Sequence, residues 1–177
     1  MFGLRVLSKK NKFKELFEPI FSDLKGYKWL FGCDSFFLPM FMAEKSDYDY
    51  EKEKYVSGAG VEFENDMTAL HDSEDWCFSK TDILSKYGEG VNEDWNGIFG
   101  FQKMLIQPHD WVKKYSEVKN QSEFVNRTVD ICFLNVDAAY WEIHCKNQQW
   151  IAIIKEHLRS LPKVESYACD ISKSYGL

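Results

Sequence analysis

The pattern of apolar and polar positions is most regular in the last third of the chain. Residues 128–136 (TVDICFLNV) are apolar at nearly every position, which predicts a central strand buried on both faces. In residues 138–145 (AAYWEIHC) apolar and polar side chains alternate, which predicts a second strand. One face would carry Trp141, Ile143 and Cys145, and the other Tyr140, Glu142 and His144. The short connection predicts a hairpin between the two strands.

Helical periodicity marks three other stretches. Between residues 13 and 24 apolar side chains recur at helical spacing, but Pro19 lies inside this stripe and predicts a kink or two short helices. Pro108 occupies a favoured first helical position and opens a second helix. A third carries an apolar stripe that starts at Trp150 and ends before Pro162.

Shorter signals complete the expected fold. Residues 3–9, 27–32 and 164–171 read as strands, and Ser79 and Gly88 bound a short helix. In residues 92–101 (NEDWNGIFGF), Trp95, Ile98 and Phe99 are spaced as one helical turn. We therefore expect a single α+β domain over residues 1–177, with a mostly antiparallel sheet flanked by about four helices.

Three Asp-Trp pairs fall close together, at Asp75-Trp76, Asp94-Trp95 and Asp110-Trp111. Carboxylates beside aromatic rings can form a sugar-binding platform, but they can also be helix caps followed by core anchors. Asp94 and Asp110 lie at expected helix starts, whereas Asp75 precedes a strand-like segment. We interpret the pairs as caps and core anchors.

Composition narrows the class of protein. No apolar run approaches the ~20 residues of a membrane span, and the N-terminus lacks the order of a signal peptide, so we expect a cytoplasmic protein without membrane association. The five cysteines are widely spaced and include no CxxC, which argues against a disulfide framework or a zinc knuckle. We expect free thiols and no cofactor or metal.

Charge is distributed unevenly. Residues 44–95 hold fifteen acidic and five basic side chains, a local net of −10, whereas the rest of the chain has a net of +4. This acidic middle argues against nucleic acid as a direct ligand, because phosphate binding requires positive charge. It suits a basic protein partner, although a solvated face that only aids solubility has the same composition.

Few residues form a constellation with catalytic chemistry. The chain has no phosphate-binding loop, no G-x-S-x-G and no H-E-x-x-H. Glu142 and His144 share a strand face, where the carboxylate could orient the imidazole as a general base. The alternative is an incidental ion pair on a half-exposed strand face, which we favour. A Cys145–His144 dyad is geometrically poor because the two side chains point to opposite faces.

Two resemblances add to this interpretation. Residues 16–32 (LFEPIFSDLKGYKWLFG) and 129–147 (VDICFLNVDAAYWEIHCKN) resemble segments of small uncharacterised bacterial cytoplasmic domains. Residues 77–101 (CFSKTDILSKYGEGVNEDWNGIFGF) resemble segments of immunity proteins from bacterial toxin systems. The second resemblance implies an inhibitor that binds a toxin domain in the cytoplasm, and it brings no catalytic residues.

The leading hypothesis is therefore a non-enzymatic protein that binds a basic partner, such as a toxin domain, through an acidic, tyrosine-rich surface. The expected contact residues are Asp47, Tyr48, Asp49, Tyr50, Glu51, Asp72, Glu74, Asp75 and Glu93. One alternative is a small hydrolase or nucleotide-handling enzyme that uses Glu142 and His144. Another is a structural or regulatory module without such a target.

Overall fold

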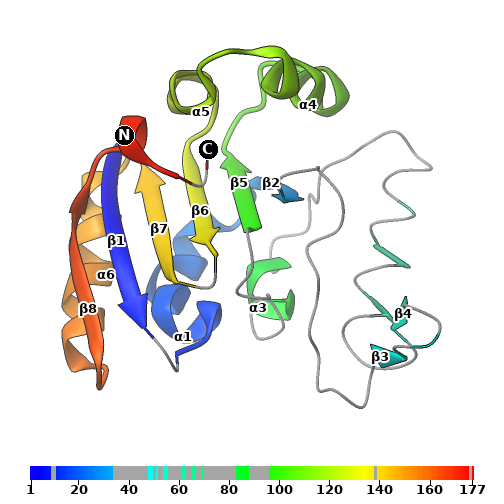
Figure 1. Cartoon of the computed structure of the whole chain (residues 1–177). Helices are drawn as coiled ribbons and strands as arrows, with labels where there is room; N and C mark the ends of the chain where they lie inside the picture. The colour runs from blue at the N-terminus through cyan, green and yellow to red at the C-terminus, as the bar shows by residue number, and fades with distance from the viewer. Residues whose placement is uncertain are drawn as a thin grey trace.

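The computed structural model describes residues 1–8, 11–33, 48–49, 51, 54–55, 61–62, 65–66, 69, 83–87, 96–137, 139–175 and 177. Its centre is a six-stranded sheet in the order β2-β5-β6-β7-β1-β8, in which every neighbouring pair is antiparallel (Figure 1). The strands are β1 (Phe2–Ser8), β2 (Lys28–Cys33), β5 (Asn96–Phe101), β6 (Ile131–Val136), β7 (Tyr140–Cys145) and β8 (Val164–Cys169). The α+β class and the mostly antiparallel sheet are as the sequence predicts.

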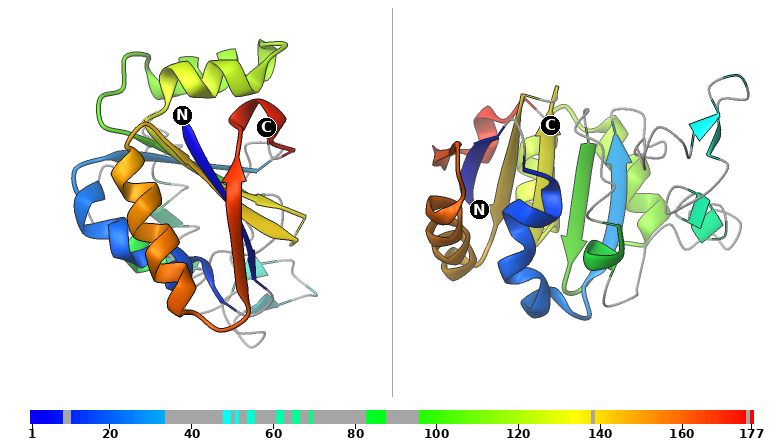
Figure 2. Two further views of the ribbon diagram at one scale, coloured as in Figure 1. Left: turned by 90° about the vertical axis from the view of Figure 1, so that its left-hand side faces the viewer. Right: turned by 90° about the horizontal axis from the view of Figure 1, so that it is seen from below.

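Helices cover both faces of the sheet (Figure 2). One face packs against α1 (Phe13–Phe17), the 3-10 helix η1 (Glu18–Leu24), α3 (Ile83–Tyr87) and α6 (Gln148–Ser160). The other packs against α4 (Pro108–Glu117), α5 (Gln121–Thr128) and the 3-10 helix η3 (Ile171–Lys173). The described residues thus form five α-helices, close to the four expected. None of them has the length and apolar character needed to cross a membrane.

Aromatic rings fill the core on the α1 side. Phe133 of β6 lies 5.0 Å from the ring centroids of both Phe13 and Phe17, and Trp141 of β7 lies 5.1 Å from Phe13. These four side chains are at most 3% exposed. Trp141, Ile143 and Cys145 all belong to this core, so the predicted apolar face of β7 is confirmed.

A second aromatic core lies between the sheet and α4. Trp111 packs on Phe99, Tyr115 and Phe124, with ring centroids 5.3 to 5.4 Å apart. Its indole N–H donates to Thr128 Oγ1 at 2.8 Å, which ties α4 to α5. The strand β6 separates the two cores and is buried at all six positions, as predicted for a strand covered on both faces.

Pro19 has the predicted effect. The helix that begins at Phe13 ends at Phe17, and the chain continues as a 3-10 helix with the proline in its first turn. Proline lacks the N–H that would donate to the carbonyl four residues earlier, so the regular α-helical pattern stops there. Both pieces still place their apolar side chains on the sheet.

The helical turn predicted over residues 95–99 is wrong. Residues 96–101 form β5, which pairs with β2 and β6. Ile98 points into one core and Phe99 into the other, so the helical spacing was a coincidence of three residues. A Cβ at Gly100 would stand 2.5 Å from Cζ3 of Trp29, so the packing across β5 leaves room only for glycine.

The sequence analysis missed α5 altogether. Asn120 is its N-cap, with the side-chain oxygen accepting from the backbone N–H of Glu123 at 3.0 Å. An Asn followed three residues later by Glu is a recognisable helix start, and this signal was available in the sequence. The predicted strand over residues 128–136 correspondingly begins later, at Ile131.

A small hairpin lies apart from the main sheet. The strands β3 (Tyr48–Asp49) and β4 (Lys54–Tyr55) pair antiparallel, with Tyr48 opposite Tyr55 and Asp49 opposite Lys54. Figures 1 and 2 place this hairpin beyond the β2 edge of the sheet. It belongs to the acidic middle of the chain.

Replacing Trp141 with alanine should lower the free energy of unfolding by about 3–5 kcal/mol, because it leaves a cavity among the rings of Phe13, Phe17 and Phe133. The indole nitrogen of Trp141 has no hydrogen-bond partner among the described residues, which favours the lower end of this range. Urea unfolding measures the loss. Tyr175→Ala, at a side chain 75% exposed, is the control and should change stability by less than about 0.5 kcal/mol. A loss below about 1 kcal/mol for Trp141→Ala would contradict the core assignment.

Candidate functional site

Glu142 and His144 are fully buried, so the half-exposed strand face expected for them is wrong. Both side chains are 0% exposed. The reason is that their side chains lie on the face of the sheet that α4, α5 and η3 cover, beside Leu134 and Cys132 of β6. Two further side chains complete a polar cluster with Glu142 and His144. Arg5 comes from the neighbouring strand β1, and Cys169 comes from β8 on the far side of β1. We call Arg5, Glu142, His144 and Cys169 the β7 polar cluster.

The carboxylate of Glu142 is at the centre of this cluster. Its Oε1 accepts from Nε and Nη2 of Arg5 at 2.8 and 2.6 Å, and its Oε2 lies 3.0 Å from Nε2 of His144. The guanidinium of Arg5 also lies over the ring of Tyr140, 4.3 Å from its centroid. The buried charge of Glu142 is therefore compensated by a cation and by hydrogen bonds.

Cys169 belongs to the cluster because the residue of β1 that lies between His144 of β7 and Cys169 of β8 is a glycine, Gly3. Gly3 pairs with His144 on one side and with Cys169 on the other. A Cβ at Gly3 would stand 2.5 Å from Nδ1 of His144, so any other residue would obstruct the imidazole. With glycine there, Nε2 of His144 comes within 4.0 Å of the Cys169 sulfur, although a whole strand separates their backbones.

Burial and charge set the ionisation of this cluster. Burial alone would raise the pKa of the Glu142 carboxyl, but hydrogen bonds from His144, Ser174 and Arg5 outweigh it and hold that pKa below its usual range. Burial, helped by the nearby Glu142 charge, raises the pKa of the Cys169 thiol to about 12. At neutral pH, Glu142 is thus a carboxylate and Cys169 a thiol.

This arrangement does not match a nucleophilic triad. In such a triad the imidazole uses one nitrogen for the nucleophile and the other for the orienting carboxylate. Here Nε2 of His144 faces both Glu142 and Cys169, while Nδ1 is buried without a hydrogen-bond partner among the described residues. Cys145 lies on the opposite face and donates to the Asn147 carbonyl at 3.0 Å. The poor geometry predicted for a Cys145–His144 dyad is confirmed.

The donor atoms of Glu142, His144 and Cys169 all lie within 4.8 Å of one another. A carboxylate oxygen, an imidazole nitrogen and a thiol sulfur are a set that can ligate a transition metal. The sequence analysis found Glu142 and His144 but missed Cys169. Only the pairing of β1 with β8 brings that side chain to the other two.

The predicted partner-binding residues lie mainly in the acidic middle, and three of them fall among the described residues. Tyr48 and Asp49 form β3, and Glu51 follows in the turn with an exposed side chain. Oδ1 of Asp49 accepts from the backbone N–H of Glu51 at 3.0 Å, an Asx turn that fixes the two residues relative to each other. The other predicted contact residues lie outside the described residues, namely Asp47, Tyr50, Asp72, Glu74, Asp75 and Glu93.

Part of the acidic middle is neutralised internally. Nζ of Lys86 on α3 lies 3.3 Å from Oε2 of Glu62 and 3.3 Å from Oδ2 of Asp66. Among the Asp-Trp pairs, Trp111 is 1% exposed and is a core anchor as predicted, and Asp110 lies in the first turn of α4, although the N-cap is Gln107 and no side chain caps this helix. A helix start at Asp94 is wrong, since residues 96–101 form a strand, and the pairs at 75–76 and 94–95 themselves lie outside the described residues.

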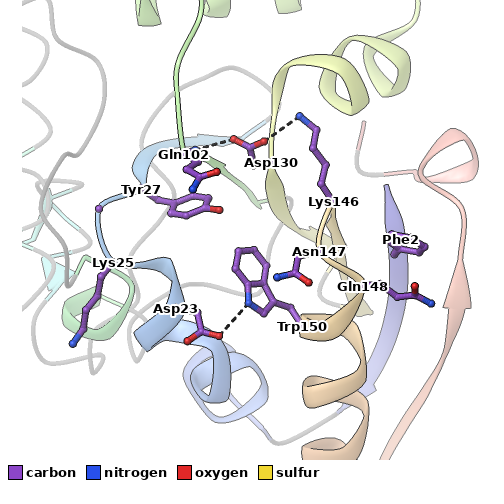
Figure 3. Close-up of a pocket in the computed structure, with 11 residues that line it drawn as sticks. Phe2, Asp23, Lys25, Tyr27, Gln102, Asp130, Lys146, Asn147, Gln148 and Trp150 are labelled. Atoms are coloured by element: carbon purple, nitrogen blue, oxygen red, sulfur yellow. Dashed lines mark hydrogen bonds and ion pairs between the residues drawn. The ribbon is translucent and has the colours of Figure 1, made fainter.

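A polar pocket of about 610 Å³ is a feature that sequence reasoning did not find. It lies where η1 leads into β2, near the ends of β5 and β7 and the starts of β6 and α6. Figure 3 shows Tyr27, Gln102, Asn147 and Trp150 around it, with Lys25 pointing away. Its two carboxylates already have partners: Asp23 accepts from Trp150 Nε1 at 3.1 Å, and Asp130 lies 3.1 Å from Lys146 Nζ and accepts from Gln102 N at 2.8 Å. The two aspartates and two lysines that line the pocket give it no net charge.

The comparisons with known proteins add no relative. Family models, curated proteins and solved structures were all searched, and none of them matches this chain.

Removing the positive charge of Arg5 should destabilise the fold, because it leaves the buried Glu142 carboxylate without its cation. We expect Arg5→Met to cost about 2–4 kcal/mol, somewhat less than a fully buried pair, since the Arg5 side chain keeps 20% exposure. The control is Lys146→Met, which breaks the more exposed pair with Asp130 and should cost less than about 1 kcal/mol. Denaturant unfolding of both variants measures the two losses in the free energy of unfolding. Equal losses would show that the buried Arg5–Glu142 pair contributes no more to stability than the more exposed Lys146–Asp130 pair.

Proposed function

We propose that this protein is a non-enzymatic binding protein that works in the cytoplasm and neutralises a basic protein partner, most concretely a bacterial toxin domain. The observation that carries the proposal is the separation of charge along the chain. Residues 44–95 have a net charge of −10 and the remainder +4. A nuclease toxin requires a basic cleft for its substrate, and an acidic inhibitor can cover such a cleft.

The β3–β4 hairpin gives this charge a plausible point of contact. It lies beyond the β2 edge of the main sheet, and it carries Asp49 and Glu51 (Figure 1). The Asx turn between these two residues limits their freedom before binding, which lowers the entropy lost when a partner docks. Tyrosines at positions 48, 50 and 55 would supply contact area at low entropic cost.

The β7 polar cluster supports this proposal over a hydrolase built on Glu142 and His144. Both side chains are 0% exposed, and the Glu142 carboxylate is occupied by Arg5 and His144. A general base must come within hydrogen-bond distance of a substrate proton, and a fully buried, fully paired carboxylate offers no such approach.

A direct test is toxin neutralisation. Large secreted toxins encoded immediately upstream of this gene are the first candidates, and their isolated toxic domains would be expressed in cells with and without this protein. The proposal expects growth to be restored only when the two are present together, and expects the purified pair to form a complex. Turnover of an ester, phosphoester or nucleotide substrate by the purified protein, with no binding to the toxin domain, would favour the enzyme alternative.

The acidic hairpin makes a kinetic prediction. Asp49→Asn combined with Glu51→Gln should slow association with the basic partner about 3- to 10-fold, part of the roughly 10–10³-fold that electrostatic steering supplies. The salt dependence of association should flatten, while dissociation changes less. Asparagine keeps the Oδ1 acceptor of the Asx turn, so the hairpin should be preserved. Surface plasmon resonance at two salt concentrations measures both rates.

The matched control removes two acids elsewhere. Glu117→Gln with Glu165→Gln makes the same change in net charge at exposed positions on α4 and β8. If both double variants slow association equally, net charge and not the hairpin governs the encounter. Tyr48→Ala should instead mainly speed dissociation. Unchanged rates in all of these variants would remove the hairpin from the contact surface.

A further inference from the structure

We propose that Glu142, His144 and Cys169 bind a single Zn²⁺ ion. This site is independent of the proposed partner binding and lies on different elements, β7 and β8. The ligands would be Oε2 of Glu142, Nε2 of His144 and Sγ of Cys169. These three donor types match the ligands that zinc uses in proteins, and a water molecule would complete the tetrahedral coordination.

The first support is convergence. Side chains on strands separated by a third strand normally stay apart, because neighbouring strands are roughly 4.8 Å apart. In this sheet the imidazole of His144 extends over Gly3 towards β8, so that Nε2 comes to 4.0 Å from Sγ of Cys169 and 3.0 Å from Oε2 of Glu142. A side chain at residue 3 would prevent this approach. The three donor atoms lie within 4.8 Å of one another, and side-chain adjustment would bring them to Zn–N, Zn–O and Zn–S distances of about 2.0–2.3 Å.

The second support is that one imidazole nitrogen serves two neighbours. Nε2 of His144 lies 3.0 Å from Oε2 of Glu142 and 4.0 Å from Sγ of Cys169, so both groups face the same nitrogen. An ion at that nitrogen would be bound by all three groups at once. On binding, the imidazole proton moves to Nδ1 and the thiol releases its proton to solvent. Nδ1 has no hydrogen-bond partner among the described residues, so its N–H would be buried and unpaired, which lowers the affinity for the ion.

The third support is the charge of the ligand set. One carboxylate, one thiolate and a neutral imidazole offset the two charges of Zn²⁺, and the remaining positive charge is that of Arg5, whose side chain is 20% exposed. Arg5 holds Oε1 of Glu142 through two hydrogen bonds and leaves Oε2 directed at His144. Arg5 would therefore be a positioning residue that does not bind the ion itself but orients the ligand Glu142, as hydrogen-bond partners of metal-binding carboxylates do. Cys169 is only partly buried, so the ion can enter from its side.

The experiment uses the whole purified chain, freed of metal by a chelator and titrated with Co²⁺ as a spectroscopic substitute for Zn²⁺. One equivalent of Co²⁺ should bind and give a thiolate-to-cobalt charge-transfer band, and Zn²⁺ should remove that band by displacement. Zn²⁺ should also raise the midpoint of thermal unfolding, since it binds the folded state. The matched control is Cys145→Ala, a thiol on the opposite face of the sheet, which should leave the band and the shift intact.

Cys169→Ala should abolish both signals, and Cys169→Ser provides a second variant of nearly unchanged shape should the alanine variant fold poorly. Arg5→Lys, which keeps the positive charge, should weaken Zn²⁺ binding about 10–100-fold if Arg5 positions Glu142. No saturable binding of one equivalent, or a charge-transfer band that persists in Cys169→Ala, would overturn the proposal. The β7 polar cluster would then be an ion-pair network only. Neither result affects the toxin-neutralisation test, whose readout contains no metal.

Discussion

The insertion of the N-terminal strand between β7 and β8 is the constraint on which the rest of the structure depends. The strand β1 pairs antiparallel with both neighbours over most of its length. It therefore connects the first residues of the chain to the last strand and fills the interior of the sheet rather than its edge. Without β1, β7 would keep only β6 as a neighbour and β8 would have no partner strand. The Glu142 carboxylate would also have no ion pair with Arg5.

This placement also explains how a polar cluster exists inside the protein. One face of β1 and β7 contributes Leu4, Val6, Trp141 and Ile143 to the core under α1 and α6. The opposite face contributes Arg5, Glu142 and His144. Burial of the Glu142 carboxylate is tolerated because the guanidinium of Arg5 reaches it from the adjacent strand β1 and the imidazole of His144 from the same strand. The strand alternation that builds the core thus gathers the polar groups as well.

The molecule has two regions of different chemical character. The six-stranded sheet and its helices hold two aromatic cores, the β7 polar cluster and a polar pocket without net charge. The β3–β4 hairpin, which belongs to the acidic middle of the chain, lies beyond the β2 edge (Figures 1 and 2). We propose that the β3–β4 hairpin contacts a partner and that the β7 polar cluster binds an ion. The two proposals therefore involve different residues.

The sequence by itself determined the features that depend on local pattern. The alternation in residues 138–145 defined the core face of β7, the apolar run before it defined a doubly covered strand, and Pro19 ended a helix. These predictions are confirmed because local backbone geometry fixes side-chain direction: side chains alternate between the two faces of a strand and recur every 3.6 residues along a helix. The helical turn predicted at 95–99 is wrong because three residues are too few to separate the helical period from the strand period, and Gly100 suits close packing in a strand.

Only the tertiary structure decided what the polar face of β7 became. Sequence alternation placed Glu142 and His144 on one side of a strand, but not whether water or protein would cover that side. The strand order put β1 beside β7 and β8 beside β1, and α4, α5 and the 3-10 helix η3 cover the face on which Glu142 and His144 lie. Arg5 and Cys169 lie 137 and 27 residues from Glu142 along the chain, and contacts at such separations depend on strand pairing that no local pattern specifies.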